Sequence, residues 1–285
     1  MRAISRLTRT ARAVAAVTAR PPYVPPGHFH SPLTSAADAR RALARDGTAP
    51  GGVNLREREQ LTLAAHVRPV LEAPLPGPRY LPGNGWYSAA DAAVYRAMLH
   101  YVRPTMVIEA GSGYSTAIAL DEAAAGPAFA DLAVTCIEPN PDRLLGLLRP
   151  GDLDRLTLLR QPVQDVPMPV YRTLRAGDIL FVDSTHVVKP GSDVVWLVLD
   201  VFPRLAAGVV VHLHDVFWPF TYPKTWLREH RDWTEAYLVQ AFLSGNSDWE
   251  ILFFSSWLWH RHREAVPPRL LHDRAPGSLW LRKAR

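Results

Sequence analysis

The sequence predicts an α/β fold built on a mostly parallel sheet, and two patterns lead to this prediction. From about residue 106 onward, short apolar runs alternate with stretches of helical periodicity, which is the order of βαβ units. The runs are apolar at successive positions, as in strands that are covered on both faces. With 285 residues, of which 48% are hydrophobic, the chain has ample material for a buried core.

Seven strands are expected, and helical segments fill the intervals between them. The first five are Met106–Ala110, Ala133–Glu138, Leu156–Arg160, Asp178–Asp183 and Gly208–His214. Two later apolar segments, "WEILFFSS" and "GSLWLRK", are expected to be the final strands. One helix is predicted before the first strand, at about residues 90–100, and another at about 233–243.

The chain is predicted to have three parts. Residues 1–22 form a basic N-terminal tail, 23–90 a lead-in packed on the core, and 91–285 the α/β domain. The lead-in contains "PPYVPPGHFHSPL" and "APLPGPRYLPGNGWY", where proline and glycine interrupt regular structure. It is therefore expected to be an irregular extension with only short periodic segments.

Charge is concentrated in the tail. The formal net charge is +5, and five arginines precede the first acidic residue, Asp38. A nucleic-acid-binding protein needs basic residues on a folded face, so no nucleic-acid partner is expected. The tail is expected to be solvated, or at most to contact an anionic membrane surface peripherally. These arginines are Arg2, Arg6, Arg9, Arg12 and Arg20.

The location is expected to be cytoplasmic. The apolar stretch at 13–19 is short for a signal peptide, and no run approaches the ~20 residues of a spanning helix. The single cysteine, Cys136, excludes an internal disulfide, which fits a reducing compartment. The oligomeric state is left open.

The first chemical motif is "VIEAGSGYSTAIAL". It places Glu109 at the end of a strand, Gly111 and Gly113 in a turn, and Ser115 at the start of a helix. In open α/β sheets ligands bind beyond the carboxyl ends of the strands, where glycines allow a close approach and a helix start offers free N–H groups. The motif therefore predicts a ligand crevice.

The second strand ends in "TCIEP", so Glu138 can accept both hydroxyls of a ribose at the same crevice. A dinucleotide-binding turn requires a small residue where this chain has Thr116. Glu109 would also repel a pyrophosphate, whereas it would attract a cofactor that carries an ammonium group. A nicotinamide cofactor is thus the disfavoured alternative.

The chain resembles the class I S-adenosylmethionine-dependent methyltransferases, and among them a bacterial group that acts on small molecules. The motifs that carry the resemblance are "EAGSGYS", "IEPNP", "GDILFVDSTH" and "HLHD", and the similarity extends from about residue 23 to residue 282. It implies a Rossmann-like methyltransferase fold, with helices on both faces of a mostly parallel seven-stranded sheet, and S-adenosylmethionine as cofactor.

The resemblance also implies which residues bind the cofactor. The methionine part would lie at the glycine turn, the ribose at Glu138, and the adenine beside "QPVQDV", after the third strand. Asn84 and Tyr87 in "LPGNGWY" would close over the carboxylate end. The full set of implied cofactor-binding residues is Glu109, Gly111, Gly113, Ser115, Glu138, Gln164, Asp165 and Asp183.

The catalytic residues are predicted at the ends of the fourth and fifth strands. Asp183, His186, His214 and Asp215 follow strands that should be neighbours, about 5 Å apart. Similarity to metal-dependent O-methyltransferases suggests a divalent metal held by Asp183, His214 and Asp215. A histidine base, His186 or His214, is the alternative, because the pKa of histidine lies near neutral pH. His212 is expected to be a core residue.

The predicted function is O-methylation of a small hydroxylated acceptor, a sugar or a secondary metabolite. The aromatic segment "DVFWPFTYPKTW" could line the acceptor pocket. The alternatives are a nicotinamide-dependent oxidoreductase and a non-catalytic protein that binds S-adenosylmethionine. The acceptor itself, the atom methylated and the identity of any metal are not encoded in a recognisable motif.

Overall fold

The computed structural model describes residues 22–44, 50–75, 77–272 and 274–285. The chain forms two compact units, one made of Met1–Asp46 and Lys224–Asp232, the other of Gly47–Pro223 and Trp233–Arg285. Almost all of the predicted basic tail, residues 1–21, lies outside the described residues. No helix of the described part is long and apolar enough to cross a membrane.

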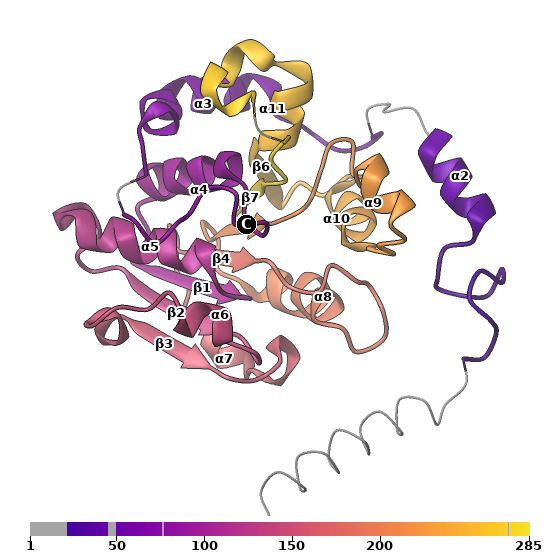
Figure 1. Ribbon diagram of the computed structural model, residues 1–285, viewed down its shortest axis with the longest axis horizontal. Coiled ribbons are helices and arrows are strands. Elements are labelled where there is room, and N and C mark those ends of the chain that lie inside the picture. The colour runs from indigo at the N-terminus through magenta and orange to yellow at the C-terminus, as the bar shows by residue number, and fades with distance from the viewer. Residues whose placement is uncertain (1–21, 45–49, 76, 273) are drawn as a thin grey trace, which may run out of the picture. The chain divides into compact units, whose positions relative to one another are not determined.

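The second unit contains one seven-stranded sheet with the order β3-β2-β1-β4-β5-β7-β6 (Figure 1). β7 runs antiparallel to both of its neighbours, and the other pairs are parallel. The predicted mostly parallel, seven-stranded sheet is therefore confirmed. The strands are β1 (Met106–Ala110), β2 (Ala133–Ile137), β3 (Leu156–Leu159), β4 (Ile179–Val182), β5 (Val210–Leu213), β6 (Trp249–Phe254) and β7 (Leu279–Lys283).

The apolar runs become strands because the sheet is covered on both faces. Every residue of β4 and β5 is buried, as are four of the five residues of β1. The register aligns Ala110 with Val182, and Val182 with Leu213. The carboxyl ends of the three central strands thus lie at one level, and the residues that follow them meet at one edge of the sheet.

Helices connect the strands and cover the sheet (Figure 1). Parallel neighbours need such crossover connections, because a tight turn can join only antiparallel strands. The chain enters β1 from α4, whose first residues are capped by Ser88, and leaves it through α5. The main helices are α4 (Ala89–Val102), α5 (Tyr114–Ala125), α6 (Asp142–Leu145), α7 (Met168–Tyr171), α8 (Asp193–Val195), α10 (Glu235–Leu243) and α11 (Ser255–Arg261).

The lead-in is more regular than predicted. It contains α3 (Glu57–Glu72), a helix of 16 residues that contacts α4 and β6. The buried residues of α3 recur at helical spacing, so the expectation of only short periodic segments was wrong. Gln60 ties this helix to the sheet by accepting a hydrogen bond of 2.7 Å from the backbone N–H of Phe254.

The first unit brings together two helices that are far apart in sequence. α2 (Ala36–Ala44) contacts α9 (Lys224–Arg228). The backbone N–H of Thr34 donates to Asp232 at 3.2 Å, and the guanidinium of Arg231 lies 4.6 Å from the ring centre of Trp226. Residues 224–232 thus leave the second unit between β5 and α10 to pair with the lead-in.

Candidate active site

The glycine turn joins β1 to α5. Gly111 has a φ of +97°, and a Cβ there would lie only 2.0 Å from the backbone oxygen of Asp183. Both facts require glycine, because a side chain would be strained and would collide with the end of β4. Gly113 is the N-cap of α5, and its N–H donates to Oγ1 of Thr116 at 3.1 Å. The turn is thereby held directly against the end of β4.

Glu109 lies beneath this turn and is fully buried. Its Oε2 accepts a hydrogen bond from Thr116, and Sγ of Cys136 lies at 3.5 Å. Its Oε1 has no partner within the described chain. Burial raises the pKa of Glu109 to about 7, although hydrogen bonds from Thr116, Cys136 and Ser115 oppose the rise. Glu109 therefore has an unused acceptor next to the crevice, as a residue that meets a cationic ligand requires.

The other predicted cofactor residues follow β2 and β3. Glu138 is half-buried, and its Oε1 accepts from the N–H of Asn140 at 2.8 Å, which leaves the second oxygen available. Gln164 and Asp165 are exposed in a short 3₁₀ turn at Val163–Asp165. Gln164 donates to the backbone oxygen of Gly191 at 3.0 Å. Gln164 therefore has a structural contact in addition to its predicted role beside the adenine.

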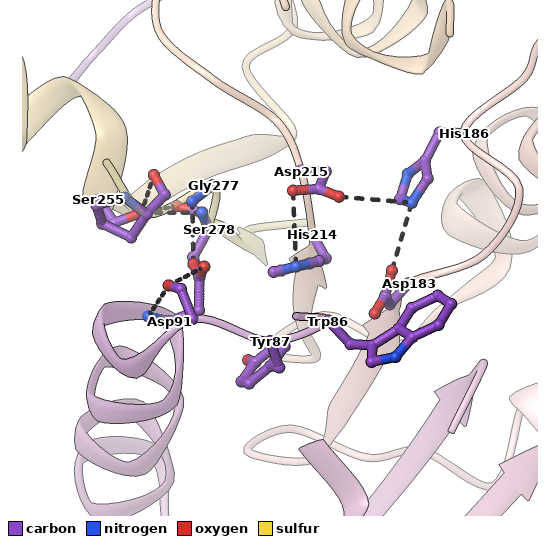
Figure 2. A network of polar contacts seen from close by, with 12 residues as sticks. Trp86, Tyr87, Asp91, Asp183, His186, His214, Asp215, Ser255, Gly277 and Ser278 are labelled. Atoms are coloured by element: carbon purple, nitrogen blue, oxygen red, sulfur yellow. Dashed lines mark hydrogen bonds and ion pairs between the residues drawn. The ribbon is translucent and has the colours of Figure 1, made fainter. Parts of the chain in front are cut away.

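The predicted catalytic residues lie together at the ends of β4 and β5 (Figure 2). Nε2 of His186 lies 3.3 Å from Oδ1 of Asp183 and 3.9 Å from Oδ2 of Asp215. Nε2 of His214 lies 3.6 Å from Oδ1 of Asp215. We call these four residues, Asp183, His186, His214 and Asp215, the polar cluster. Strand adjacency alone brings their parent loops together, as the sequence predicts.

Two members of the polar cluster have unusual backbone conformations. His186 has a φ of +59° and Asp215 a φ of +57°, a region that side-chain-bearing residues rarely adopt. Such conformations cost about 1–3 kcal/mol and persist only where the surroundings hold them. Here the backbone oxygen of His186 accepts from the N–H groups of Thr234 and Glu235, at 2.9 and 3.1 Å. The first turn of α10 thus fixes the position of His186.

Glu235 is a member of the site that the sequence analysis missed. Its Oε2 lies 2.8 Å from Nδ1 of His186, and its side chain is only 2% exposed. The residue begins α10, 49 positions beyond its partner, and its carboxylate resembles any acidic residue in the first turn of a helix. No linear pattern distinguishes it. An acidic residue at the start of a later helix, paired with a histidine after a strand, is the signal that can be sought.

The charges of the polar cluster shift its pKa values. Burial would raise the pKa of Asp183, but the neighbouring His214 and His186 outweigh burial and lower it to about 2. Burial opposes the charge of His186, yet hydrogen bonds to Asp183 and Glu235 raise its pKa well above the ordinary value. Burial raises the pKa of Asp215, against the pull of both histidines. The cluster therefore favours protonated histidines beside ionised Asp183.

The suggested metal site is not supported. Among the residues that the structure describes, no three or more His, Cys, Asp or Glu side chains are arranged so that they could hold a metal ion. The physical reason is the position of His186, whose Nε2 lies between Asp183 and Asp215. A ring nitrogen of His186 thus makes the contacts with both carboxylates that an ion would otherwise make.

His212 belongs to the core, as predicted. It is fully buried, and its ring lies 4.1 Å from that of Phe181 and 4.5 Å from that of Trp280, measured between centres. Burial lowers its pKa well below the ordinary value, so the ring is neutral. Neither ring nitrogen has a partner among the described residues. His212 is thus too deep to touch an acceptor.

A short segment lies between the glycine turn and the polar cluster. Oδ1 of Asn84 accepts from the N–H groups of Trp86 and Tyr87, at 2.8 and 2.9 Å, so Asn84 shapes the turn. The ring of Tyr87 then packs on that of His214 with 4.9 Å between centres. We call residues 84–87 the cover segment. That Asn84 and Tyr87 close over the carboxylate end of the cofactor stays a prediction.

The start of β7 is tied to the first turn of α4. Oδ1 of Asp91 accepts hydrogen bonds from the N–H of Gly277, at 3.0 Å, and from Oγ of Ser278, at 2.9 Å (Figure 2). A Cβ on Gly277 would lie 3.0 Å from Cα of Asp215. This close packing holds the backbone of Asp215 from the side opposite to β4.

The aromatic segment after β5 is mostly structural. Phe217, Trp218, Phe220 and Tyr222 are all buried, and Phe220 packs on Phe254 with 5.3 Å between ring centres. Trp226 belongs to α9, in the other unit. The four buried residues pack in the interior of their unit, and an aromatic wall of the acceptor pocket stays a prediction.

Comparison with known proteins identifies a methyltransferase domain. A family profile described as a methyltransferase domain matches residues 108–216, which extend from β1 to just beyond β5. A protein of Archaeoglobus fulgidus, itself uncharacterised, is 31% identical over 172 residues, or 54% of this chain and 75% of that protein. The methyltransferase match decides against the nicotinamide-dependent alternative.

Two solved structures show similarity at low identity. The SAH-bound methyltransferase PaMTH1 of Podospora anserina is 15% identical, with 80% of this chain and 88% of that chain covered and a TM-score of 0.43. Human N-acetylserotonin methyltransferase in complex with SAM is 11% identical, with 90% and 72% covered and a TM-score of 0.40. The chain belongs to the same family as the archaeal protein, and it carries a methyltransferase domain of the class I, S-adenosylmethionine-dependent type.

Proposed function

We propose that this protein transfers the methyl group of S-adenosylmethionine to a hydroxyl oxygen of a small acceptor, and that His186 removes the hydroxyl proton. The observation that carries the proposal is the position of His186. Its ring lies between Asp183 and Asp215, and Glu235 binds the nitrogen on its far side. Gly111, in the glycine turn, packs against the backbone of Asp183, so the proposed base and the cofactor crevice are adjacent.

The chemistry requires little from the protein at carbon, because the sulfonium of the cofactor is already a good leaving group. The acceptor oxygen attacks the methyl carbon as the carbon–sulfur bond breaks, and a neutral thioether remains. In the fraction of molecules in which His186 is neutral, which grows as the pH rises toward its raised pKa, Nε2 takes the hydroxyl proton. The resulting cation is stabilised by Glu235 through Nδ1. The products are the methylated acceptor, the neutral thioether and protonated His186.

The exposed fractions of the side chains in the polar cluster indicate where the hydroxyl of the acceptor would enter. The side chain of Asp183 is 36% exposed, that of Asp215 is 17% exposed and that of His186 only 5%. A hydroxyl that approaches from the crevice meets Asp183 first. The carboxylate of Asp183, with a pKa of about 2, is ionised and can accept a hydrogen bond from a neighbouring hydroxyl of the acceptor, which leaves the reacting hydroxyl free to donate to Nε2 of His186. Asp183 would thus orient the acceptor toward His186. A nearly closed base favours a small acceptor, such as a sugar or a secondary metabolite.

His214 has a supporting role in this proposal. Its Nε2 lies near Asp215 and its ring is covered by Tyr87, so it is less open to an acceptor than Asp183 is. Its pKa is raised, because the carboxylates of Asp215 and Asp183 outweigh the opposing effect of burial. Its positive charge helps to keep Asp183 ionised. Replacement of His214 is therefore expected to weaken catalysis through Asp183.

The test is a search for the acceptor followed by a comparison of variants. The purified protein is incubated with S-adenosylmethionine labelled in the methyl group and with a panel of hydroxylated sugars, phenols and catechols, and S-adenosylhomocysteine and the labelled product are measured. With the best acceptor, His186→Asn is compared with the surface control His260→Asn. Transfer of the label to nitrogen, sulfur or carbon, or a parent-like rate for His186→Asn, would contradict the proposal.

A further inference from the structure

Arg143 in α6 lies against the glycine turn of the cofactor crevice. A Cβ on Gly113 would be 3.1 Å from Cδ of Arg143, so the arginine side chain passes directly over this glycine. On its other side, the guanidinium carbon lies 3.7 Å from the ring centre of Trp86, a cation–π contact. Arg143 therefore lies between the cofactor turn and the cover segment.

The charge of Arg143 is not neutralised by the protein. Other arginines of the same unit are paired, such as Arg79 with Asp152 and Arg96 with Glu122, at 2.7 and 2.5 Å. Within the described part of the chain, Arg143 has no carboxylate within ion-pair distance, and its contact is with an aromatic face. An unpaired guanidinium beside a ligand crevice has all its N–H donors available for a carboxylate or phosphate.

Trp86 is a large apolar side chain that is not packed in the core. Its residue surface is 64% exposed, which leaves a large apolar side chain in water. The turn made by Asn84 fixes the backbone on which it stands, and its neighbour Tyr87 is held on His214. Hydrogen bonds thus hold the backbone that carries the indole, and the indole ring packs on the guanidinium of Arg143. A supported aromatic face restricts the rotamers of an arginine and reduces the entropy lost when it binds an anion.

The charged residues of the crevice suit the ammonium and the carboxylate in the amino-acid part of S-adenosylmethionine. Glu109 has an unpartnered carboxylate oxygen on one side of the glycine turn, which fits an ammonium group. The carboxylate of the same amino acid needs a cation nearby, and Arg143 supplies one beside Gly113. A carboxylate near Asp183 or Glu138 would instead be repelled.

We propose that Arg143 binds the carboxylate of S-adenosylmethionine and that Trp86 holds the guanidinium in place for it. The proposal rests on the cofactor assignment but not on the acceptor or on the proposed base. In this proposal, Arg143 and Trp86 are the residues by which the site distinguishes S-adenosylmethionine from adenosine thioethers that lack the amino-acid part. Trp86 is a positioning residue, since it acts through Arg143.

Three ligands separate this role from a general effect on binding. S-adenosylhomocysteine carries the carboxylate, decarboxylated S-adenosylhomocysteine lacks only that group, and 5′-methylthioadenosine lacks the whole amino-acid end. By calorimetry, Arg143→Gln is expected to lose roughly 10- to 100-fold in affinity for S-adenosylhomocysteine, the usual value of a charge-assisted hydrogen bond. Its affinity for the other two ligands should stay within about 2-fold of the parent value. Trp86→Leu should show the same selectivity with a smaller loss.

The matched control is Arg172→Gln, which removes one positive charge from an exposed position of the same unit. It is expected to bind all three ligands like the parent. Melting temperatures of the variants verify that each is folded. An equal loss for all three ligands, or no loss for any, would overturn the role of Arg143. If the parent itself bound no S-adenosylhomocysteine, the cofactor assignment would fail instead, so the two failures are distinct.

Discussion

Nδ1 of His186 lies 2.8 Å from Oε2 of Glu235, and both side chains are buried. Burial opposes a charge on the ring, but the hydrogen bonds to Asp183 and Glu235 raise the pKa of His186 well above its ordinary value. A base with a raised pKa is unprotonated only at higher pH. The value of kcat/KM is therefore expected to rise with pH above neutrality and to level off once His186 has lost its proton.

Glu235→Gln tests whether this carboxylate sets the pKa of the base. Loss of the negative charge lowers the pKa of His186, so the rising part of the pH profile should move to lower pH. His186→Ala should lower the rate by roughly 10²- to 10⁴-fold, the usual contribution of a general base. The exposed Glu264→Gln is the control. A uniform loss of rate at every pH, with no shift of the profile, would show that Glu235 is only structural.

Glu109 should make the stability of the ligand-free protein depend on pH. In the unfolded chain it ionises near its model value of 4.5, and in the folded protein at about 7, because burial disfavours the charge. Between these values the unfolded state binds fewer protons, so the free energy of unfolding falls as pH rises. Glu109→Gln should therefore stabilise the ligand-free protein at pH 8, by up to about 3 kcal/mol, and much less at pH 5. Urea unfolding at both pH values measures this, and an equal effect at both would speak against a buried, ionising Glu109.

Glu138→Ala should weaken the binding of S-adenosylhomocysteine by about 1–3 kcal/mol, because the variant lacks an acceptor for the ribose hydroxyls. One oxygen of Glu138 is already used by Asn140, so the local turn must be verified by circular dichroism. Calorimetry beside the exposed control Asp154→Ala gives the difference. Unchanged affinity in Glu138→Ala would remove this residue from the cofactor site.

Chelators should leave methyl transfer unchanged, and added divalent ions should not increase it. The reason is that a ring nitrogen of His186 makes the contacts with Asp183 and Asp215 that an ion would otherwise make. The assay compares the initial rate with the identified acceptor before and after EDTA treatment and dialysis. Loss of activity that a divalent ion restores would mean that the His186 ring moves aside and that a metal takes its place.

Arg79 should be required for stability. It is 7% exposed and pairs with Asp152 at 2.7 Å and with Asp121 at 2.7 Å. Arg79→Met leaves two buried carboxylates without their cation and should cost about 3–5 kcal/mol in the free energy of unfolding. Arg79→Met combined with Asp121→Asn and Asp152→Asn should recover much of this loss. Failure of the triple variant to recover would assign the loss to packing rather than to charge.

The sheet and the place of its site follow from the sequence because both depend on local pattern. Runs such as Ile179–Val182 are apolar at every position, and this requires burial on both faces. Parallel strands then place whatever follows them at one edge, so Asp183 and Asp215 were predicted as neighbours without knowledge of any contact. The strand ends are also where the chain carries most of its recognisable motifs.

What the sequence analysis missed depends on contacts between distant segments. Glu235 meets His186 only because the first turn of α10 packs on the loop after β4, and Arg143 meets Trp86 across 57 positions of chain. The suggested metal site is not supported for a related reason. Residue types at strand ends cannot reveal that a histidine three positions farther on, His186, contacts both carboxylates. α3 was different, since its helical spacing was present in the sequence but was obscured by the surrounding proline and glycine.

The position of β7 affects how the protein is made. β5 carries His214 and Asp215 at its end, and its outer neighbour is β7, formed by residues 279–283. During synthesis β5 leaves the ribosome before β7 has been made. The edge of the sheet beside His214 and Asp215 is therefore open at that stage. An open edge of this kind is a template for wrong pairing with another chain. We expect the active site to form only after synthesis has passed residue 283, so translation that stops early would yield an aggregating product rather than a weakly active enzyme.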